Sequence, residues 1–203
     1  GFLGGVLVPP FDRRKTFEEL FNLLHLANQL NCDVDIHIDE SGQYPAAGLK
    51  QLIRVLDRME NKVTITCSHS SSMGLMGQKN LSDLADRLAE YQVNVIAMPL
   101  TNAWLLNHNS KQTPIQRPLA PIKQLQAAGV TVAIGGDNVQ DSWFPIGNLD
   151  PISLMSYSLP LTQLSPWERS GLAPFTTSAS ALMGLEWDGT ISIGSPADFV
   201  LLN

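Results

Sequence analysis

A short apolar run that ends in two glycines and an aspartate limits most strongly what this chain can fold into. Residues 130–134 read VTVAI, and Gly135, Gly136 and Asp137 follow directly. Uninterrupted runs of this kind are typical of strands that are buried on both faces, as in parallel sheets. Because glycine lets the backbone turn tightly, we expect Asp137 at the carboxyl tip of a buried strand, where parallel α/β folds place their chemistry. An isolated Gly-Gly-Asp is also an ordinary turn, so this interpretation depends on whether the arrangement recurs.

A second strand that ends in ionisable side chains is predicted at residues 33–40, which read DVDIHIDE. Apolar residues at every second position indicate a strand with one apolar face. His37, Asp39 and Glu40 then lie at its carboxyl end. A carboxylate close to a histidine supports general acid–base chemistry or metal ligation, because both groups carry protons and donate lone pairs. The alternative is a solvated strand end with incidental charges.

Two further predicted strands end in polar side chains. Residues 63–69 read VTITCSH, so that His69 closes the run and three serines follow it. Ser70 beside His69 raises the alternative of a serine nucleophile, but the sequence around it lacks the G-x-S-x-G elbow that exposes such a serine. The run at residues 93–100 leads to Asn102, whose amide suits either a substrate amide or ring nitrogen, or the loop backbone.

The strand ends recur along the chain at intervals that are typical of βα units. Ends at Glu40, His69, Leu100 and Asp137 are separated by roughly 30 to 40 residues, and a helical segment follows each. Residues 4–8 (GGVLV) predict one more strand before the first helix. The predicted fold class is therefore α/β, with about five strands in sequence order. The imidazole and carboxylate donors at the strand ends suit Zn²⁺ or Fe²⁺.

The helices are predicted from apolar residues that recur on one face and from capping residues. Thr16 and Glu19 form a capping-box pattern that opens the first helix. Gly129 suits the left-handed position that closes a helix. Residues 189–202 predict a small β hairpin rather than another βα unit. The predicted helical ranges are 16–30, 46–59, 80 or 82 to 91, 118 or 121 to 128, a short helix from 165, and 176–182.

Charge and composition exclude several classes of partner. The formal net charge is −6 and the sequence contains no basic patch, which argues against nucleic acid. The apolar runs are far shorter than the ~20 residues that cross a membrane, and the start of the chain does not read as a signal peptide. Cys32 and Cys67 form neither a C-x-x-C pair nor a disulfide framework, so we expect a reducing, cytoplasmic setting.

Three motifs together resemble one enzyme family. They are H-x-D-E at residues 37–40, S-H-S around His69, and G-x-D-N-x-x-D-x-W-x-P-x-G at residues 135–147. In combination they resemble the cytosine deaminase branch of the amidohydrolase superfamily, and the N-substituted ammelide amidohydrolases have a similar D-N-x-x-D-x-W segment. Residues 189–202, GTISIGSPADFVLL, resemble the family's ending, where the chain returns to a small β-sandwich beside a barrel.

The resemblance implies a partial (β/α)8 TIM-type barrel, about strands four to eight, over residues 1–186, and a β segment of the sandwich over residues 187–203. It also implies one divalent metal ion, Zn or Fe, and a cyclic amine or amide as the small-molecule substrate. The corresponding roles are assigned by matching motifs. His37 and Asp137 match metal ligands, Glu40 matches the glutamate that shuttles protons, and His69 matches the histidine that holds the attacking water. Asp137 also matches the acceptor of that water's proton, and the remaining matches, Asn138, Asp141 and Trp143, line the substrate pocket.

One family motif has no counterpart here. The family begins with an H-x-H pair that supplies two metal ligands, whereas the four histidines of this chain are His25, His37, His69 and His108. We expect His25 to be structural and His108 to be solvated. The chain is therefore expected to be the C-terminal part of a longer, metal-dependent deaminase of cytosine or a related ring, inactive as an isolated fragment. An N-alkylammelide-type amidohydrolase, a non-catalytic half-barrel that needs a partner, and homo-oligomer formation stay open.

Overall fold

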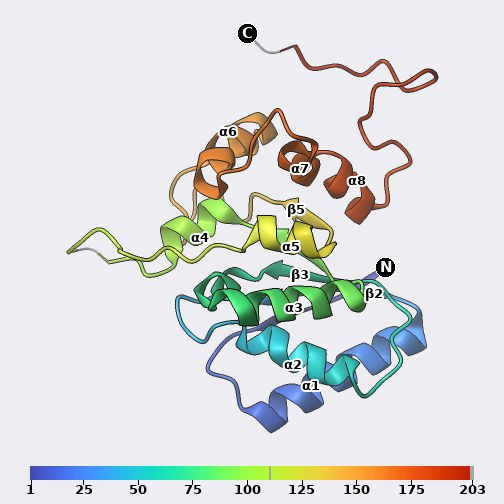
Figure 1. Ribbon diagram of the computed structural model, residues 1–203, viewed down its shortest axis with the longest axis vertical. Coiled ribbons are helices and arrows are strands. Elements are labelled where there is room, and N and C mark those ends of the chain that lie inside the picture. Colours follow the sequence, from blue (N-terminus) through green and yellow to red (C-terminus); the bar gives the residue numbers. More distant parts are fainter. Residues whose placement is uncertain (110, 202–203) are drawn as a thin grey trace.

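A computed structural model describes residues 1–109 and 111–201 and shows a five-stranded parallel sheet with helices between its strands (Figure 1). The strands lie in sequence order, so that each pairs with its predecessor. They are β1 (Phe2–Leu7), β2 (Asp33–Ile38), β3 (Ile65–His69), β4 (Asn94–Ala97) and β5 (Val132–Ile134). The helices are α1 (Arg13–Leu30), α2 (Ala47–Leu56), α3 (Gln78–Glu90), α4 (Pro99–Leu105), α5 (Ile122–Ala128), α6 (Pro151–Thr162), α7 (Arg169–Leu172) and α8 (Thr177–Met183), with the 3-10 segments η1 (Ser71–Leu75) and η2 (Ala173–Phe175).

The sequential strand order places the connecting helices on one face of the sheet. Connections between neighbouring parallel strands are right-handed in nearly all proteins, so repeated steps in one direction put the crossover helices on the same side. In agreement, α1 packs beside α2, and α3 packs beside both α2 and α5. On the opposite face Ser68 Oγ donates a hydrogen bond to Asp35 Oδ1 across 3.0 Å. The predicted α/β class with five parallel strands is confirmed.

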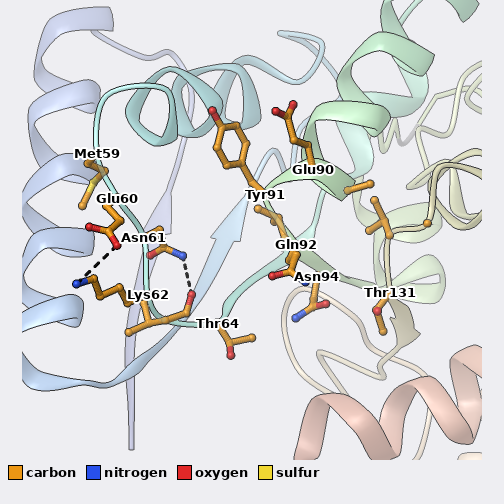
Figure 2. A pocket seen from close by; sticks show the side chains of 15 residues that line it. Met59, Glu60, Asn61, Lys62, Thr64, Glu90, Tyr91, Gln92, Asn94 and Thr131 are labelled. Atoms are coloured by element: carbon orange, nitrogen blue, oxygen red, sulfur yellow. Dashed lines mark hydrogen bonds and ion pairs between the residues drawn. The ribbon is translucent and has the colours of Figure 1, made fainter.

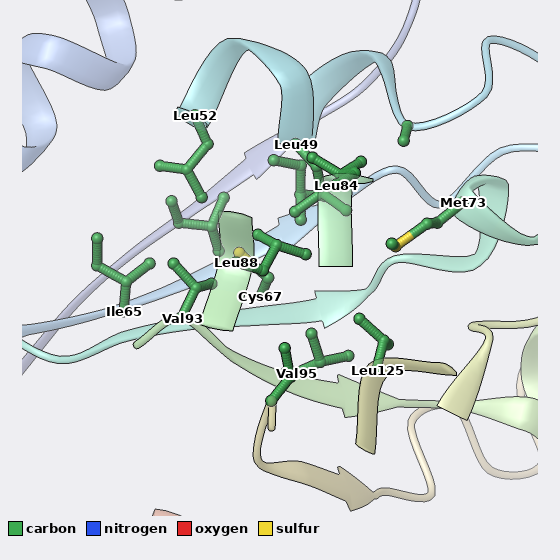
Figure 3. Close-up of a cluster of buried hydrophobic side chains, with 14 of the residues drawn as sticks. Leu49, Leu52, Ile65, Cys67, Met73, Leu84, Leu88, Val93, Val95 and Leu125 are labelled. Atoms are coloured by element: carbon green, nitrogen blue, oxygen red, sulfur yellow. The ribbon is translucent and has the colours of Figure 1, made fainter. Parts of the chain in front are cut away.

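The hydrophobic core lies between the helical layer and the sheet. Figure 3 shows Leu49 of α2 and Leu84 and Leu88 of α3 gathered close to Cys67 of β3, and all four are buried. Burying a leucine side chain contributes about 1.5–3 kcal/mol, so this layer contributes strongly to holding the strands in register. Rigid strands in turn fix the positions of the side chains that follow their carboxyl ends.

The predicted helices form, with shifts of a few residues at their ends. α1 ends at Leu30 as predicted but begins at Arg13, because the side chain of Asp12 accepts hydrogen bonds from backbone N–H groups of the first turn. The capping-box assignment to Thr16 is therefore wrong, and Thr16 lies inside the helix. Gly129 adopts a left-handed conformation with φ of 94° at the end of α5, which confirms its predicted role.

Two helices and the carboxyl-terminal segment differ from the sequence prediction. Neither α4 nor α6 was expected, and α6 lacks the apolar face that signals a helix in a sequence. The predicted hairpin is wrong over its described part, because residues 189–201 contain no strand; Leu202 lies outside the described residues. A lone hairpin is marginal in water without a surface to pack against, and Ile191 and Ile193 are exposed. The division of the chain at residue 187 stays a prediction.

Within the described ranges, no helix combines the length and the apolar character needed to cross a membrane. Cys32 and Cys67 are free thiols. Cys67 lies in the core, where burial raises the pKa of its thiol and keeps it in the protonated, unreactive form.

Candidate active site

The carboxyl ends of three strands bring four predicted site residues to one edge of the sheet. His37 is the penultimate residue of β2 and Glu40 follows that strand, His69 ends β3, and Asp137 follows β5. Asp39, His69 and Asp137 all have positive φ angles, of 57°, 70° and 65°. Such angles are uncommon outside glycine and cluster at functional sites, because only a constrained surrounding keeps the backbone there. The strand ends are therefore held in unusual conformations where the predicted chemistry lies.

His37 and His69 contact each other directly. His37 Nδ1 lies 2.9 Å from His69 Nε2, and the ring centroids are 4.9 Å apart. Burial, and after it the neighbouring His37, lowers the pKa of His69 to about 4. His69 is therefore neutral at neutral pH, and a neutral imidazole has one nitrogen that donates and one that accepts.

Glu40 and Asp137 complete a compact cluster with His69. One oxygen or nitrogen from each of these three side chains lies within 4.8 Å of those of the other two, and Glu40 Oε2 is 3.6 Å from His69 Nε2. Burial, and after it the charge of Asp137, raises the pKa of Glu40 to about 7. Burial also raises the pKa of Asp137, although the nearby His37 opposes that shift. A carboxyl group that titrates near neutrality is suited to proton transfer.

The nitrogen and oxygen donors of this cluster fit a divalent ion such as zinc or ferrous iron. The grouping is not the one expected from the sequence. Glu40, His69 and Asp137 form the compact set, and His37 reaches it through its contact with His69. Catalytic zinc usually has three protein ligands and a water molecule, so the pair His37 and Asp137 alone makes an incomplete set. That assignment of metal ligands stays a prediction.

Asp39, which the sequence placed among the ionisable groups at the end of β2, has a structural role. Its side chain is 1% exposed, and its two carboxylate oxygens accept hydrogen bonds from the backbone N–H groups of Gly48 at 2.9 Å and Leu49 at 2.8 Å. These groups belong to the first turn of α2, whose cap residue Ala46 offers no side-chain acceptor. Burial raises the pKa of Asp39, and the two backbone hydrogen bonds oppose that shift. Asp39 therefore caps α2 and fixes the backbone next to Glu40.

The serines after β3 join the ends of β2 and β3 into one unit. Ser71 Oγ donates to the backbone carbonyl of Asp39 at 3.0 Å, and the backbone N–H of Ser72 donates to the same carbonyl. Ser72 Oγ accepts a hydrogen bond from the backbone N–H of Ala46 at 3.0 Å. Ser70 is completely buried, so it is inaccessible to a substrate as it stands. The geometry therefore favours a structural role for these serines over a nucleophilic one.

Asn102 lies on α4, beyond the end of β4, and contacts His69. Its side chain is 1% exposed, and Nδ2 is 3.1 Å from His69 Nδ1. The preceding Thr101 is also buried and donates a hydrogen bond through Oγ1 to the carbonyl of Gly136 at 3.2 Å. The sequence interpretation offered a substrate or a loop backbone as the partner of Asn102; the structure gives its Nδ2 a histidine side chain, and a substrate contact of Asn102 stays a prediction. The unexpected helix α4 is the reason, because it turns Asn102 toward β3.

The predicted substrate-binding residues after Asp137 lie in one loop, in which Asn138 and Asp141 are half-buried and Trp143 is exposed. Asn138 Nδ2 donates to Asp141 Oδ2 at 2.5 Å, and Asp141 Oδ1 accepts from the backbone N–H groups of Trp143 and Phe144. These hydrogen bonds, led by that from Phe144, lower the pKa of Asp141 and keep it ionised. The Trp143 side chain is 59% exposed and free to contact a ligand. A substrate-binding role for Asn138, Asp141 and Trp143 stays a prediction.

The other two histidines lie away from the cluster. His25 lies on α1, 3.0 Å from the side chain of Gln29, and its ring stacks on Phe21. His108 is exposed beside Trp104, with ring centroids 5.2 Å apart. The exposure of His108 agrees with the expectation from the sequence, whereas His25 is also exposed and its structural role stays a prediction.

Two hollows of the described surface also lie outside the cluster. The first, about 760 Å³, is at the amino ends of β3, β4 and β5, the opposite edge of the sheet, where Figure 2 shows Glu60 paired with Lys62 and Asn61 bonded to the backbone. The second, about 1000 Å³, is lined mainly by apolar groups and lies beside Trp104 of α4. The ionisable side chains of the candidate site therefore lie at the carboxyl ends of the strands and not in these two hollows.

Comparison of the sequence with models of protein families gives a match that covers most of the chain. The family model described as "Amidohydrolase family" matches residues 8–203. The chain belongs to the amidohydrolase family. The match includes every site residue described above.

Individual amidohydrolases are similar to this chain at moderate identity. The pterin deaminase of Rhizobium rhizogenes (strain K84 / ATCC BAA-868) is 27% identical over 205 residues, covering 100% of this chain and 46% of its own length. The N-isopropylammelide isopropyl amidohydrolase of Pseudomonas sp. (strain ADP) is 25% identical, covering 99% of this chain and 47% of its own. The structure of 5-methylcytosine deaminase from Klebsiella pneumoniae liganded with phosphonocytosine has a TM-score of 0.79 at 25% identity, over 97% of this chain and 48% of that chain.

This amidohydrolase chain spans about half the length of the relatives that it matches. The five parallel strands therefore correspond to part of the amidohydrolase barrel. Their numbering as strands four to eight of that barrel stays a prediction.

The raised pKa of Glu40 predicts that the amidohydrolase chain loses stability as the pH rises. Between pH 4.5 and about 7 the folded state holds a proton on Glu40 that the unfolded state has lost, so the free energy of unfolding falls through this window. Because the side chain is 30% exposed, we expect the loss to be about 2 kcal/mol. Urea unfolding of the wild type and of Glu40→Gln at pH 5 and pH 8, with a chelator present, measures it. The variant should gain about that amount relative to the wild type at pH 8, and parallel pH dependence in the two proteins would contradict the assignment.

Proposed function

We propose that this chain contributes part of the active site of a metal-dependent hydrolase that removes the exocyclic amino group of a pyrimidine or related ring as ammonia. The observation that carries the proposal is the convergence of His37, Glu40, His69 and Asp137 at one sheet edge. The similarity to a pterin deaminase and to a 5-methylcytosine deaminase supports ring deamination as the reaction class. The exposed Trp143 offers an aromatic surface on which a planar ring can stack.

The proposed roles follow from the position and protonation of each group. A divalent ion held by His37 and Asp137, with further ligands, would lower the pKa of a coordinated water molecule and supply a nucleophile at neutral pH. Glu40, with a pKa raised to about 7, is suited to protonate the ring nitrogen and then the departing amine. His69 lies within 3.6 Å of Glu40 and would orient the attacking oxygen. Asp137 would accept its proton.

A second candidate is hydrolysis of an N-alkyl aminotriazine, which would release an alkylamine in place of ammonia. The observation in its favour is Asn138 directly after Asp137, in the segment that resembles the ammelide amidohydrolases. The similarity to the N-isopropylammelide enzyme supports it. The two candidates share the metal and the roles of Glu40 and Asp137, and differ only in the group that leaves the ring.

Metal content and amine release test the proposal together. Zinc and iron are measured in the 203-residue chain and in the product of the complete reading frame in which it lies, and both are assayed with cytosine, pterin and N-isopropylammelide. We expect little metal and no turnover in the 203-residue chain, and about one metal ion and ammonia release in the full product. Asp137→Asn should abolish both metal and turnover, whereas the exposed control Asp198→Asn should change neither.

The outcomes separate the candidates. Isopropylamine from N-isopropylammelide, without ammonia from cytosine or pterin, would establish the second candidate. A full-length product with neither metal nor turnover would overturn both, and would leave the non-catalytic half-barrel as the better description. Full turnover by the 203-residue chain alone would show that its metal site is completed without further residues.

A further inference from the structure

Three side chains form a continuous polar chain behind the cluster. Asn102 Nδ2 lies 3.1 Å from His69 Nδ1, and His69 Nε2 lies 2.9 Å from His37 Nδ1. Asn102 and His69 are each 1% exposed, so water does not compete for these contacts. Each imidazole nitrogen of His69 therefore faces a fixed partner, and those partners determine which nitrogen carries the proton.

The amide of Asn102 determines the tautomer of His69. An amide nitrogen donates hydrogen bonds and does not accept them, so a nitrogen that it faces must offer a lone pair. With Nδ2 facing Nδ1, the proton of neutral His69 lies on Nε2, which faces His37 Nδ1 at 2.9 Å and Glu40 Oε2 at 3.6 Å. In the metal-free chain His37 Nδ1 therefore accepts the hydrogen bond from that nitrogen. A nitrogen that carries a proton has no lone pair for a metal ion, so His69 then acts as a hydrogen-bond donor in the site and not as a ligand.

α4 is anchored in a way that keeps the amide in place. Thr101, the neighbour of Asn102, donates to the carbonyl of Gly136 directly before Asp137. Two adjacent residues of α4 therefore contact the ends of two different strands. Asn102 contacts His69 at the end of β3, and Thr101 contacts Gly136, which follows β5. This two-point attachment fixes the helix relative to both sides of the cluster. Among residues 1–109 and 111–201, Asn102 Oδ1 has no hydrogen-bond partner, and the contact of Nδ2 with His69 is the one polar contact of this side chain.

We propose that Asn102 is a positioning residue that holds His69 in the tautomer with its proton on Nε2. In the metal-free chain that proton is donated to His37 Nδ1, and it would become available to the attacking oxygen if His37 Nδ1 held the metal ion. This role deepens the proposed function and rests on it for the identity of that oxygen. The tautomer itself is a property of the folded chain and does not depend on turnover.

Nitrogen-15 NMR of the metal-free, 203-residue chain tests the proposal, because protonated and unprotonated imidazole nitrogens resonate in separate ranges. In the wild type we expect His69 Nε2 to be protonated and Nδ1 to be unprotonated. Asn102→Asp places only acceptor oxygens against Nδ1, so Nδ1 should become protonated. Asn102→Leu removes the partner, and we expect a mixture of the two tautomers. Asn22→Leu makes the same change at an exposed position of α1 and serves as the control, with the wild-type pattern expected.

Wild-type His69 with its proton on Nδ1, or an unchanged pattern in both Asn102 variants, would overturn the proposal. In the full-length product, Asn102→Leu should lower kcat by about 10- to 100-fold with little change in KM, because a positioning residue acts on the reacting groups and not on substrate affinity. A rise in KM alone would return Asn102 to the role of a substrate contact. If the full-length product shows no turnover with any ring, the proposed function fails while the NMR result still decides the tautomer.

Discussion

Glu40→Gln is expected to lower the rate of ring deamination in the full-length product by about 10²- to 10⁴-fold. Glutamine has nearly the same shape as glutamate but does not take up or release a proton at neutral pH. The pKa of about 7 for Glu40 means that both protonation states are populated under working conditions, as proton transfer in two directions requires. The measurement is kcat/KM for ammonia release at pH 7, with the best ring substrate found.

The exposed Glu186→Gln is the matched control, since it makes the same chemical change away from the cluster. Its rate should equal that of the wild type, and the metal content of both variants should be unchanged if Glu40 is not a ligand. A Glu40→Gln enzyme that keeps more than about a tenth of the wild-type rate would remove Glu40 from the proton-transfer step. Loss of metal in this variant would instead assign Glu40 to the metal site, in line with its place in the compact cluster.

Asp39→Ala is expected to reduce the free energy of unfolding by about 3 kcal/mol, the largest stability effect that we predict. The substitution removes the acceptor of two charge-assisted hydrogen bonds and leaves the N–H groups of Gly48 and Leu49 buried without partners. Each such bond contributes about 1.5–3 kcal/mol, and burial of the charged carboxylate offsets part of the sum. Urea unfolding at pH 7, followed by circular dichroism, measures the change.

Two further variants separate capping from the general effect of removing a charge. Asp86→Ala removes an exposed aspartate from α3 and should change stability by less than about 0.5 kcal/mol. Asp39→Asn keeps one acceptor oxygen and should fall between the alanine variant and the wild type. Equal stability of Asp39→Ala and Asp86→Ala would show that Asp39 does not hold the start of α2.

The strands and the gathering of site residues follow from features that a sequence shows directly. Alternating apolar residues predict β2, and Val34 and Ile36 are indeed buried while His37 faces the other side. The location of functional groups at carboxyl ends follows from the parallel arrangement alone, because all strands point toward the same edge. Glu40, His69 and Asp137 could therefore be expected to meet before any distance was known.

The detailed role of each polar residue could not be predicted, because it depends on how helices pack. Asp39 and Glu40 are adjacent carboxylates that a sequence pattern does not distinguish. The start of α2 packs against Asp39, however, whereas Glu40 stays in the cluster at the site. The contact between Asn102 and His69 depends on α4, a short helix that begins at Pro99 and has no apolar period. α6 was missed for a related reason, since Ser158 is its one buried residue and Pro160 interrupts its pattern.

The two sides of the site are anchored to very different degrees. On one side, Asp39 and the buried serines after β3 tie together two strand ends and a helix. On the other, residues 145–150 are exposed and Trp143 is largely in solvent, held mainly by the turn around Asp141. Evolution can therefore alter the second side with little risk to folding, whereas changes on the first disturb the scaffold. New ring preferences should arise most readily in this exposed loop, and mutant libraries that aim to redirect substrate choice are best confined to it.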